Sequence, residues 1–183
     1  MIVIMIGSAL EHWDTETWHP VQEKISIVGS PAETIIGFSP GGNTMAVSLG
    51  TKYINVCDIL AVSAAFDRRP EAEPILYDLA VSGDGSRVVG YESSPGGSEP
   101  GYLHVWYLHS EGEPKFGRAR TLLGRLACSA DGRLFTEIYN YGTVTAYITV
   151  WDGDKLEVVT TKCISSSVIG ESARFSNNSS LLA

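Results

Sequence analysis

Cysteine is scarce in this sequence, which has three cysteines among 183 residues. No two of them form a Cys-x-x-Cys pair, and none lies near histidine at the spacing that a zinc site needs. Cys57, Cys128 and Cys163 each lie in an apolar or β-branched run, where a thiol behaves as a small hydrophobic group. We therefore expect reduced and mostly buried thiols instead of a disulfide framework or a metal centre.

Basic residues and long apolar runs are also few. The sequence has 13 Lys and Arg against 21 Asp and Glu, a formal net charge of −8, which repels nucleic-acid phosphates and anionic lipids. The apolar run at residues 1–6 has no basic region before it and is shorter than a signal-peptide core or a membrane helix. We expect an intracellular, cytoplasmic protein that binds neither nucleic acid nor membranes.

The motifs of common catalytic and phosphate-binding sites are missing. The sequence contains no G-x-S-x-G, G-x-x-x-x-G-K-[ST] or H-E-x-x-H. Its four histidines form no ligand pattern. The acidic pairs in residues 71–73 and 152–154 each supply only two of the about six oxygen ligands that calcium takes. We expect no enzyme activity, no cofactor and no bound metal.

No stretch has capped apolar residues at helical spacing, but a repeat is present. Four apolar runs each end in a serine and a tight turn, and these serines are Ser39, Ser82, Ser129 and Ser176. They are separated by 43, 47 and 47 residues, near the period of about 40 to 45 residues found in repeats of four strands. A second pattern, of the Trp-Asp type, ends at positions 14, 58, 107 and 152 and gives intervals of 44, 49 and 45 residues. Two unrelated local patterns thus give the same period.

Each repeat has the pattern of short strands joined by turns. Gly and Asp follow the repeated serines, and these residues tolerate the positive φ that tight hairpin turns require. Residues 147–151 alternate as a strand should, with Tyr147, Thr149 and Trp151 on one face. We predict an all-β fold of at least twelve short antiparallel strands in four radially arranged sheets.

On these residues the chain resembles the WD repeats of the β-propeller superfamily. Trp13-Asp14 and Trp151-Asp152 match the dipeptide that names the repeat. The segments that follow Ser39, Ser82 and Ser129 resemble the first hairpin turn of a WD blade. The resemblance covers almost the whole chain and implies blades of four antiparallel strands each.

The sequence departs from the WD pattern in three respects. The dipeptide is replaced by Cys57-Asp58 in one unit and by Trp106-Tyr107 in another, and no Gly-His pair precedes a first strand. The blades are therefore degenerate. We do not expect the buried Asp-His-Ser-Trp hydrogen-bond network that the family often uses.

The repeat predicts three complete blades and two partial ones, which together make about four. Their approximate limits are residues 1–28, 29–74, 75–122, 123–168 and 169–183. Two interpretations stay open. The chain is a piece of a longer protein, or residues 171–183 complete the blade begun by residues 1–25, within one chain or across a dimer. Terminal strands without a partner also favour self-association, because they expose unpaired backbone groups.

Two sets of residues are candidates for a role in packing or binding. Trp13, Trp106 and Trp151 recur once per unit, so we expect them to pack between adjacent blades. Trp18 falls outside the repeat register, and we take it with its neighbour His19 as a candidate surface contact. Two further loops are longer than a blade requires, and loops on a rigid scaffold often bind partners. Their candidate residues are Asp67, Arg68, Arg69, Glu71, Ser94 and Glu99.

The resemblance implies a non-enzymatic scaffold that binds a protein or peptide, as the propeller portion of a larger regulatory protein. The alternative is a module for a small ligand or a sugar, or a decayed propeller enzyme. A sugar-binding propeller should repeat a set of polar and aromatic residues in every blade, and the sequence has no such set.

Overall fold

The structure is a computed structural model. It describes residues 2–6, 9–21, 25–26, 34–49, 54–58, 65–66, 76–92, 100–108, 115–120, 125–141, 145–164, 174–176 and 179. These residues form fifteen β-strands, arranged as one three-stranded and three four-stranded sheets. The expected all-β fold is confirmed. Within these ranges there is no helix long and apolar enough to cross a membrane.

All paired strands are antiparallel, and strands follow the chain order within each sheet. The first sheet contains β1 (Ile2–Ile6), β2 (Ala9–Trp13) and β3 (Ile25–Ser26). The second contains β4 (Thr34–Phe38), β5 (Thr44–Leu49), β6 (Ile54–Asp58) and β7 (Ala65–Phe66). The third contains β8 (Leu76–Val81), β9 (Arg87–Glu92), β10 (Tyr102–Tyr107) and β11 (Lys115–Arg118). The fourth contains β12 (Arg125–Cys128), β13 (Leu134–Tyr141), β14 (Thr145–Asp152) and β15 (Glu157–Ile164).

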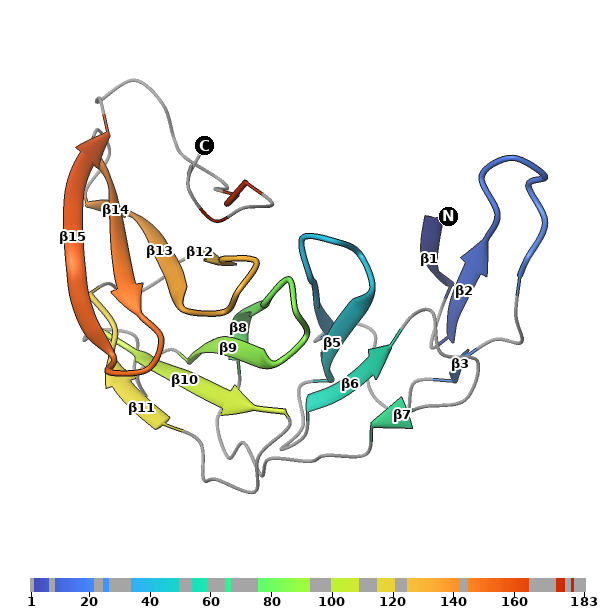
Figure 1. Cartoon of the computed structure of the whole chain (residues 1–183), viewed down its shortest axis with the longest axis horizontal. Helices are drawn as coiled ribbons and strands as arrows, with labels where there is room; N and C mark the ends of the chain where they lie inside the picture. Colours follow the sequence, from blue (N-terminus) through green and yellow to red (C-terminus); the bar gives the residue numbers. More distant parts are fainter. Residues whose placement is uncertain are drawn as a thin grey trace.

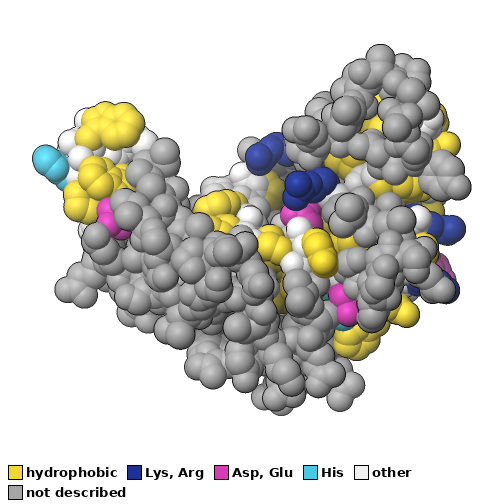
Figure 2. All heavy atoms as spheres, turned by 180° about the vertical axis from the view of Figure 1, so that it is seen from behind, with side chains coloured by type: hydrophobic (Ala, Val, Ile, Leu, Met, Phe, Trp, Pro, Cys, Tyr) yellow, Lys and Arg dark blue, Asp and Glu magenta, His cyan; other side chains and the backbone are white. Residues whose placement is uncertain are grey.

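The four sheets stand side by side along an arc (Figure 1). β8 contacts both β4 and β12, so the first strands of the complete sheets are neighbours on the inner side of the arc. The last strands, β7, β11 and β15, lie on the outer side. Seen from behind, the molecule is deeply hollowed between its two ends (Figure 2).

A serine closes the inner hairpin of each complete sheet. In the third sheet, Ser82 Oγ accepts a hydrogen bond from the Arg87 amide at 2.9 Å and donates one to Asp84 Oδ1 at 2.6 Å. Gly85 has a φ of 68°, which only glycine adopts without strain. The fourth sheet repeats these contacts with Ser129, Leu134, Asp131 and Gly132. The serine pattern in the sequence therefore marks one recurring turn.

Successive turns are hydrogen-bonded to one another. The Asp84 amide donates to Ala130 O at 2.7 Å, and the Ala130 amide donates to Ser179 Oγ at 2.9 Å. The Ser179 amide also donates to Ser176 O. Ser179 has a φ of 58°, in the positive region that the turn glycines also adopt. The last described residues thus begin a further turn beside the fourth sheet, away from β1 (Figure 1). Among the described residues, none of those at positions 174–176 and 179 joins the first sheet, so closure of a blade within one chain is not seen in this part of the chain.

Two buried apolar clusters hold neighbouring sheets together, and we call each such contact a joint. The joint between the second and third sheets contains Ala46, Ile54, Val56, Leu76, Leu79, Val81, Val88 and Trp106. The joint between the third and fourth sheets contains Ala80, Val89, Tyr91, Leu103, Val105, Ala119, Cys128, Phe135 and Trp151. In both joints the tryptophan belongs to the later sheet and packs toward the earlier one.

We expected the cysteines to be mostly buried. Of the two whose side chains the structure describes, only one is buried. Cys128 is buried and free, whereas Cys163 is free but exposed. Cys163 lies in β15, the outer strand of its sheet, where both faces meet solvent for most of the strand. An apolar or β-branched run does not reveal whether its strand is inner or outer. The side chain of Cys57 lies outside the described residues.

Candidate functional site

The two long candidate loops attach to the same end of the third sheet. Leu76, at the start of β8, pairs with Glu92 at the end of β9, and Glu92 also pairs with Tyr102 at the start of β10. The segments containing Asp67, Arg68, Arg69, Glu71, Ser94 and Glu99 join the strands here, although those six residues lie outside the described ranges. We call this end of the sheets the loop end.

A β-bulge at the loop end turns Tyr77 outward. The register of β8 against β9 shifts between Leu76 and Asp78, so Tyr77 is an extra residue without an opposite partner. Its side chain is 49% exposed. Bulges commonly redirect a side chain next to a functional site, and this one presents an aromatic ring to solvent.

The residue after Tyr77, Asp78, contacts the neighbouring inner strand β12. Asp78 Oδ2 accepts a hydrogen bond from the Leu126 amide at 2.7 Å, and Asp78 Oδ1 lies 3.9 Å from Arg125 Nη1. Burial raises the pKa of Asp78, while the Leu126 amide and Arg125 act against this rise. Arg125 is 63% exposed. Asp78 therefore joins two inner strands, and most of the Arg125 side chain stays exposed.

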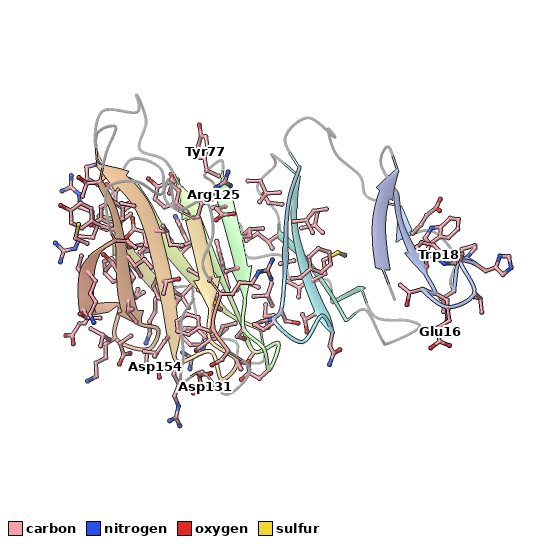
Figure 3. All side chains as sticks on the ribbon, turned by 90° about the horizontal axis from the view of Figure 1, so that it is seen from above. Glu16, Trp18, Tyr77, Arg125, Asp131 and Asp154 are labelled. Carbon is pink, nitrogen blue, oxygen red and sulfur yellow. The ribbon has the colours of Figure 1, made fainter. Side chains whose placement is uncertain are left out.

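Tyr77, Asp78 and Arg125 form what we call the rim site. Figure 3 places Tyr77 and Arg125 at one end of the sheets and Asp131 and Asp154 at the other. Arginine and tyrosine are enriched among residues that dominate binding at protein interfaces. The rim site can thus offer an aromatic surface and a cation.

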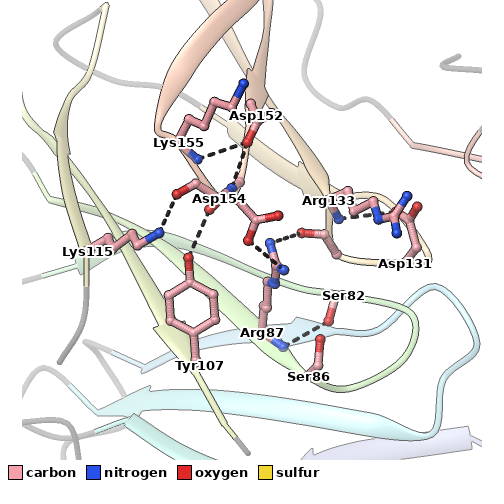
Figure 4. Close-up of polar contacts among 12 residues, drawn as sticks. Ser82, Ser86, Arg87, Tyr107, Lys115, Asp131, Arg133, Asp152, Asp154 and Lys155 are labelled. Carbon is pink, nitrogen blue, oxygen red and sulfur yellow. Dashed lines mark hydrogen bonds and ion pairs between the residues drawn. The ribbon is translucent and has the colours of Figure 1, made fainter. Parts of the chain in front are cut away.

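The opposite end of the sheets carries a polar cluster that is already engaged (Figure 4). Arg87 forms an ion pair with Asp154 at 2.9 Å and lies 5.1 Å from the Tyr107 ring centroid. Lys115 donates to the Asp154 carbonyl, and Tyr107 donates to the Gly153 carbonyl at 3.2 Å. These contacts connect the third sheet with the turn between β14 and β15. The cluster therefore stabilises a joint.

Trp18 and His19 lie in the turn after β2 and are both exposed. Asp14 Oδ1 accepts hydrogen bonds from the amides of Glu16 and Thr17, and the Trp18 amide donates to Asp14 O. Trp18 has a φ of 55°. Trp18 is 63% exposed, so it presents apolar surface to solvent.

The turn after β14 has the same geometry. Asp152 Oδ1 accepts from the amides of Asp154 and Lys155, the Leu156 amide donates to Asp152 O, and Leu156 has a φ of 56°. Trp18 therefore corresponds to Leu156, and our expectation that it falls outside the repeat register is wrong. The signal was available: both residues stand four positions after the aspartate of a Trp-Asp pair.

The three repeated tryptophans differ in their surroundings. Trp106 and Trp151 are buried in the two joints, and neither indole N–H has a hydrogen-bond partner in the described part of the chain. Trp13 is half-buried, and its indole N–H donates to Glu11 at 3.0 Å. The packing of Trp106 and Trp151 thus does not depend on a polar network.

His104 is a buried histidine in β10. Its ring stacks on Trp106 at 5.4 Å, and its Nε2 lies 2.7 Å from Glu92 Oε2. Burial lowers the pKa of His104, and the contact with Glu92 opposes this effect. The contact with Glu92 thus satisfies a ring nitrogen of His104 within the third sheet.

Sequence reasoning missed the rim site. Asp78 and Arg125 each stand four residues before a turn serine, so the repeat register already placed opposite charges at the same position of neighbouring inner strands. The bulge that exposes Tyr77 has no comparable signal in the sequence. It depends on how β8 pairs with β9.

The fold is shared with solved β-propeller-type structures. The chain aligns with Kuenenia stuttgartiensis hydrazine synthase at a TM-score of 0.60 and 15% identity, over 86% of this chain and 44% of that one. It aligns with TolB from Acinetobacter baumannii at 0.62 and 17% identity, over 95% and 42%. The third is Kluyveromyces lactis Hsv2p, at 0.60 and 15% identity, over 95% and 51%. The expected propeller-type fold is therefore confirmed.

These similarities concern the fold alone. No family model matches the sequence, and no curated protein matches it. The chain spans about half the length, or less, of the solved chains that it resembles.

Proposed function

We propose that this chain is a non-enzymatic binding module made of degenerate WD-type blades, which acts inside the cell and holds a protein or peptide partner at the rim site. The observation that carries the proposal is the bulge at Tyr77, which exposes an aromatic residue directly before Asp78, the partner of the largely exposed Arg125 side chain. The two long loops attach at the same end of the sheet and would enlarge the contact.

The chemistry of the rim site favours an extended acidic segment as the partner. Arg125 can pair with a carboxylate in two parallel hydrogen bonds, and the tyrosine ring provides apolar area with little loss of side-chain entropy. Asp78 would keep Arg125 in place while leaving its outer face free.

Capture experiments with matched variants test the proposal. The immobilised chain is exposed to cell extract, and bound proteins are quantified for the wild type, Tyr77→Ser, Arg125→Glu and Phe38→Ser. Phe38 is the control because it ends the inner strand β4, at the end of the sheets opposite the loop end, and is 45% exposed. Loss of one rim contact should weaken capture of the specific partner about tenfold or more, whereas Phe38→Ser should leave it unchanged.

A glycan array on the same four proteins distinguishes the alternative. Specific glycan binding would favour the sugar-binding module. Equal capture of every protein by all four variants would overturn the assignment of the rim site.

A further inference from the structure

Two aromatic side chains lie exposed on one face of the third sheet. Phe116, on the outer strand β11, is 62% exposed, and Tyr102, at the start of β10, is 43% exposed. Phe116 is directly opposite His104, which follows Tyr102 by two residues on β10. The two rings therefore belong to adjacent rows of the same face, at the diagonal spacing that aromatic side chains can bridge. We call this pair of rings the aromatic patch.

A carboxylate lies on the same face as the aromatic patch. Glu92, at the end of β9, is directly opposite Tyr102, and opposite residues in an antiparallel pair share a face. Glu92 Oε2 lies 2.7 Å from His104 Nε2, and the Glu92 side chain is 20% exposed. Among the described residues this carboxylate has no further hydrogen bond or ion pair. Its second oxygen can thus accept a hydrogen bond from a ligand.

His104 holds the Glu92 carboxylate and is itself held by two rings. It stacks on Trp106 with 5.4 Å between ring centroids, and Phe116 meets it edge to face at 4.8 Å. Burial keeps the pKa of His104 below its ordinary value of 6.5, although the contact with Glu92 opposes this shift. A neutral imidazole can donate its N–H to Glu92 and leaves the negative charge of the carboxylate uncompensated.

The repeat does not require these residues, because the fourth sheet lacks them. Residues that build the fold, such as Trp106 and the turn serines, recur from sheet to sheet. Counted from the tryptophan of each sheet, the fourth sheet has uncharged side chains at the three positions, namely Tyr139 for Glu92, Thr149 for His104 and Thr161 for Phe116. A set that occurs in one sheet alone points to a ligand of that sheet instead of to packing.

The charges around the patch indicate the sign of the ligand. Arg118, which is opposite Tyr102 on β11, already has an interaction partner. Glu92 is therefore the charged group of the patch with capacity for a ligand. A carboxylate beside exposed aromatic rings attracts a cation, because the faces of such rings are also electronegative.

We propose that the aromatic patch binds a basic side chain, lysine or arginine, of a peptide. The alkyl part of this side chain packs on Phe116 and Tyr102, and its charged head reaches Glu92. Long basic side chains commonly pack their stems on apolar surface, and a hydrogen bond between two charged groups is stronger than one between neutral groups. The patch is on β9, β10 and β11, whereas the rim site is on the inner strands β8 and β12, so this proposal does not rest on the proposed function.

A titration of the isotope-labelled full chain, followed by nuclear magnetic resonance, tests the binding. The probes are three capped pentapeptides of alanine whose central residue is lysine, arginine or norleucine. The lysine peptide, the arginine peptide or both should shift the amide signals of β10 and β11, and the norleucine peptide should bind about fivefold or more weakly. Equal binding of all three peptides would show an apolar contact without selection for charge and would overturn the proposal.

Matched variants locate the site. Phe116→Ser and Glu92→Gln should each weaken binding of the basic peptide about threefold or more. Glutamine keeps an oxygen that can accept from His104, so Glu92→Gln removes the charge and preserves this contact. The controls on β15 are Val159→Ser, at a residue that is 58% exposed, and Glu157→Gln, at an exposed carboxylate.

Both controls should bind the basic peptide as the wild type does. Arg125→Glu should also leave this binding unchanged, which separates a failure of this site from a failure of the rim site. A loss in the β15 variants equal to that in Phe116→Ser and Glu92→Gln would overturn the assignment of the patch.

Discussion

The turns after β2 and β14 have the same backbone geometry but different surroundings. In each, an aspartate accepts two amide hydrogen bonds and the fifth residue adopts positive φ. Leu156 packs beside the third sheet, whereas Trp18 meets solvent. Local sequence thus determines the turn, and the neighbouring sheet determines what the turn contributes to stability.

The largest expected effect is a difference in stability between substitutions of Trp151 and Trp13, the tryptophans that precede these two turns. Trp151→Ala leaves a cavity in the joint between the third and fourth sheets and should lower the free energy of unfolding by about 3–5 kcal/mol. Trp13→Ala should cost less than half as much, because Trp13 is only half-buried. Urea unfolding checks this. Equal losses would show that Trp13 packs as tightly as Trp151 does.

The same contrast explains how much of the structure the sequence could predict. The serines and turn glycines recur with the period of the repeat. The inner hairpin of each sheet could therefore be predicted from residues such as Ser82 and Ser129. The exposure of Cys163 and the bulge at Tyr77 could not, because both depend on which strands are neighbours. The position of Trp18 in the repeat could be recognised only after Asp14 and Asp152 were aligned.

A glycine between neighbouring turns should give the next largest effect. A Cβ on Gly83 would lie 2.6 Å from Ala130 Cα, so Gly83→Ala must separate two backbones and should cost about 1–3 kcal/mol. Gly41→Ala is the control, since its Cβ would meet nothing closer than 4.0 Å. The same unfolding measurement applies. A Gly83→Ala protein as stable as Gly41→Ala would show that the turns are not closely joined.

The turn serines should differ from one another. Ser129 is buried, accepts the Leu134 amide at 3.0 Å and donates to Asp131 at 2.7 Å. Ser39 accepts the Thr44 amide at 3.0 Å, but Gly41 replaces the aspartate. Ser129→Ala should therefore cost about 1–2 kcal/mol, and Ser39→Ala somewhat less. A double-mutant cycle with Asp131→Asn should show coupling at Ser129.

The smallest effect should be a dependence on pH that is equal in the two turns. Backbone hydrogen bonds from Thr17 and Glu16 lower the pKa of Asp14 below its ordinary value of 3.8, and those from Lys155 and Asp154 lower that of Asp152. A lowered pKa in the folded state means that each carboxylate stabilises the fold above about pH 4, and that this contribution is lost as pH falls through the folded pKa. Asp14→Asn and Asp152→Asn should each remove the same small part of the acid dependence, whether or not a neighbouring sheet is present. Urea midpoints between pH 3 and pH 7 test this, and a clearly larger change for Asp152→Asn would mean that the joint, and not the turn alone, sets the proton affinity of that carboxylate.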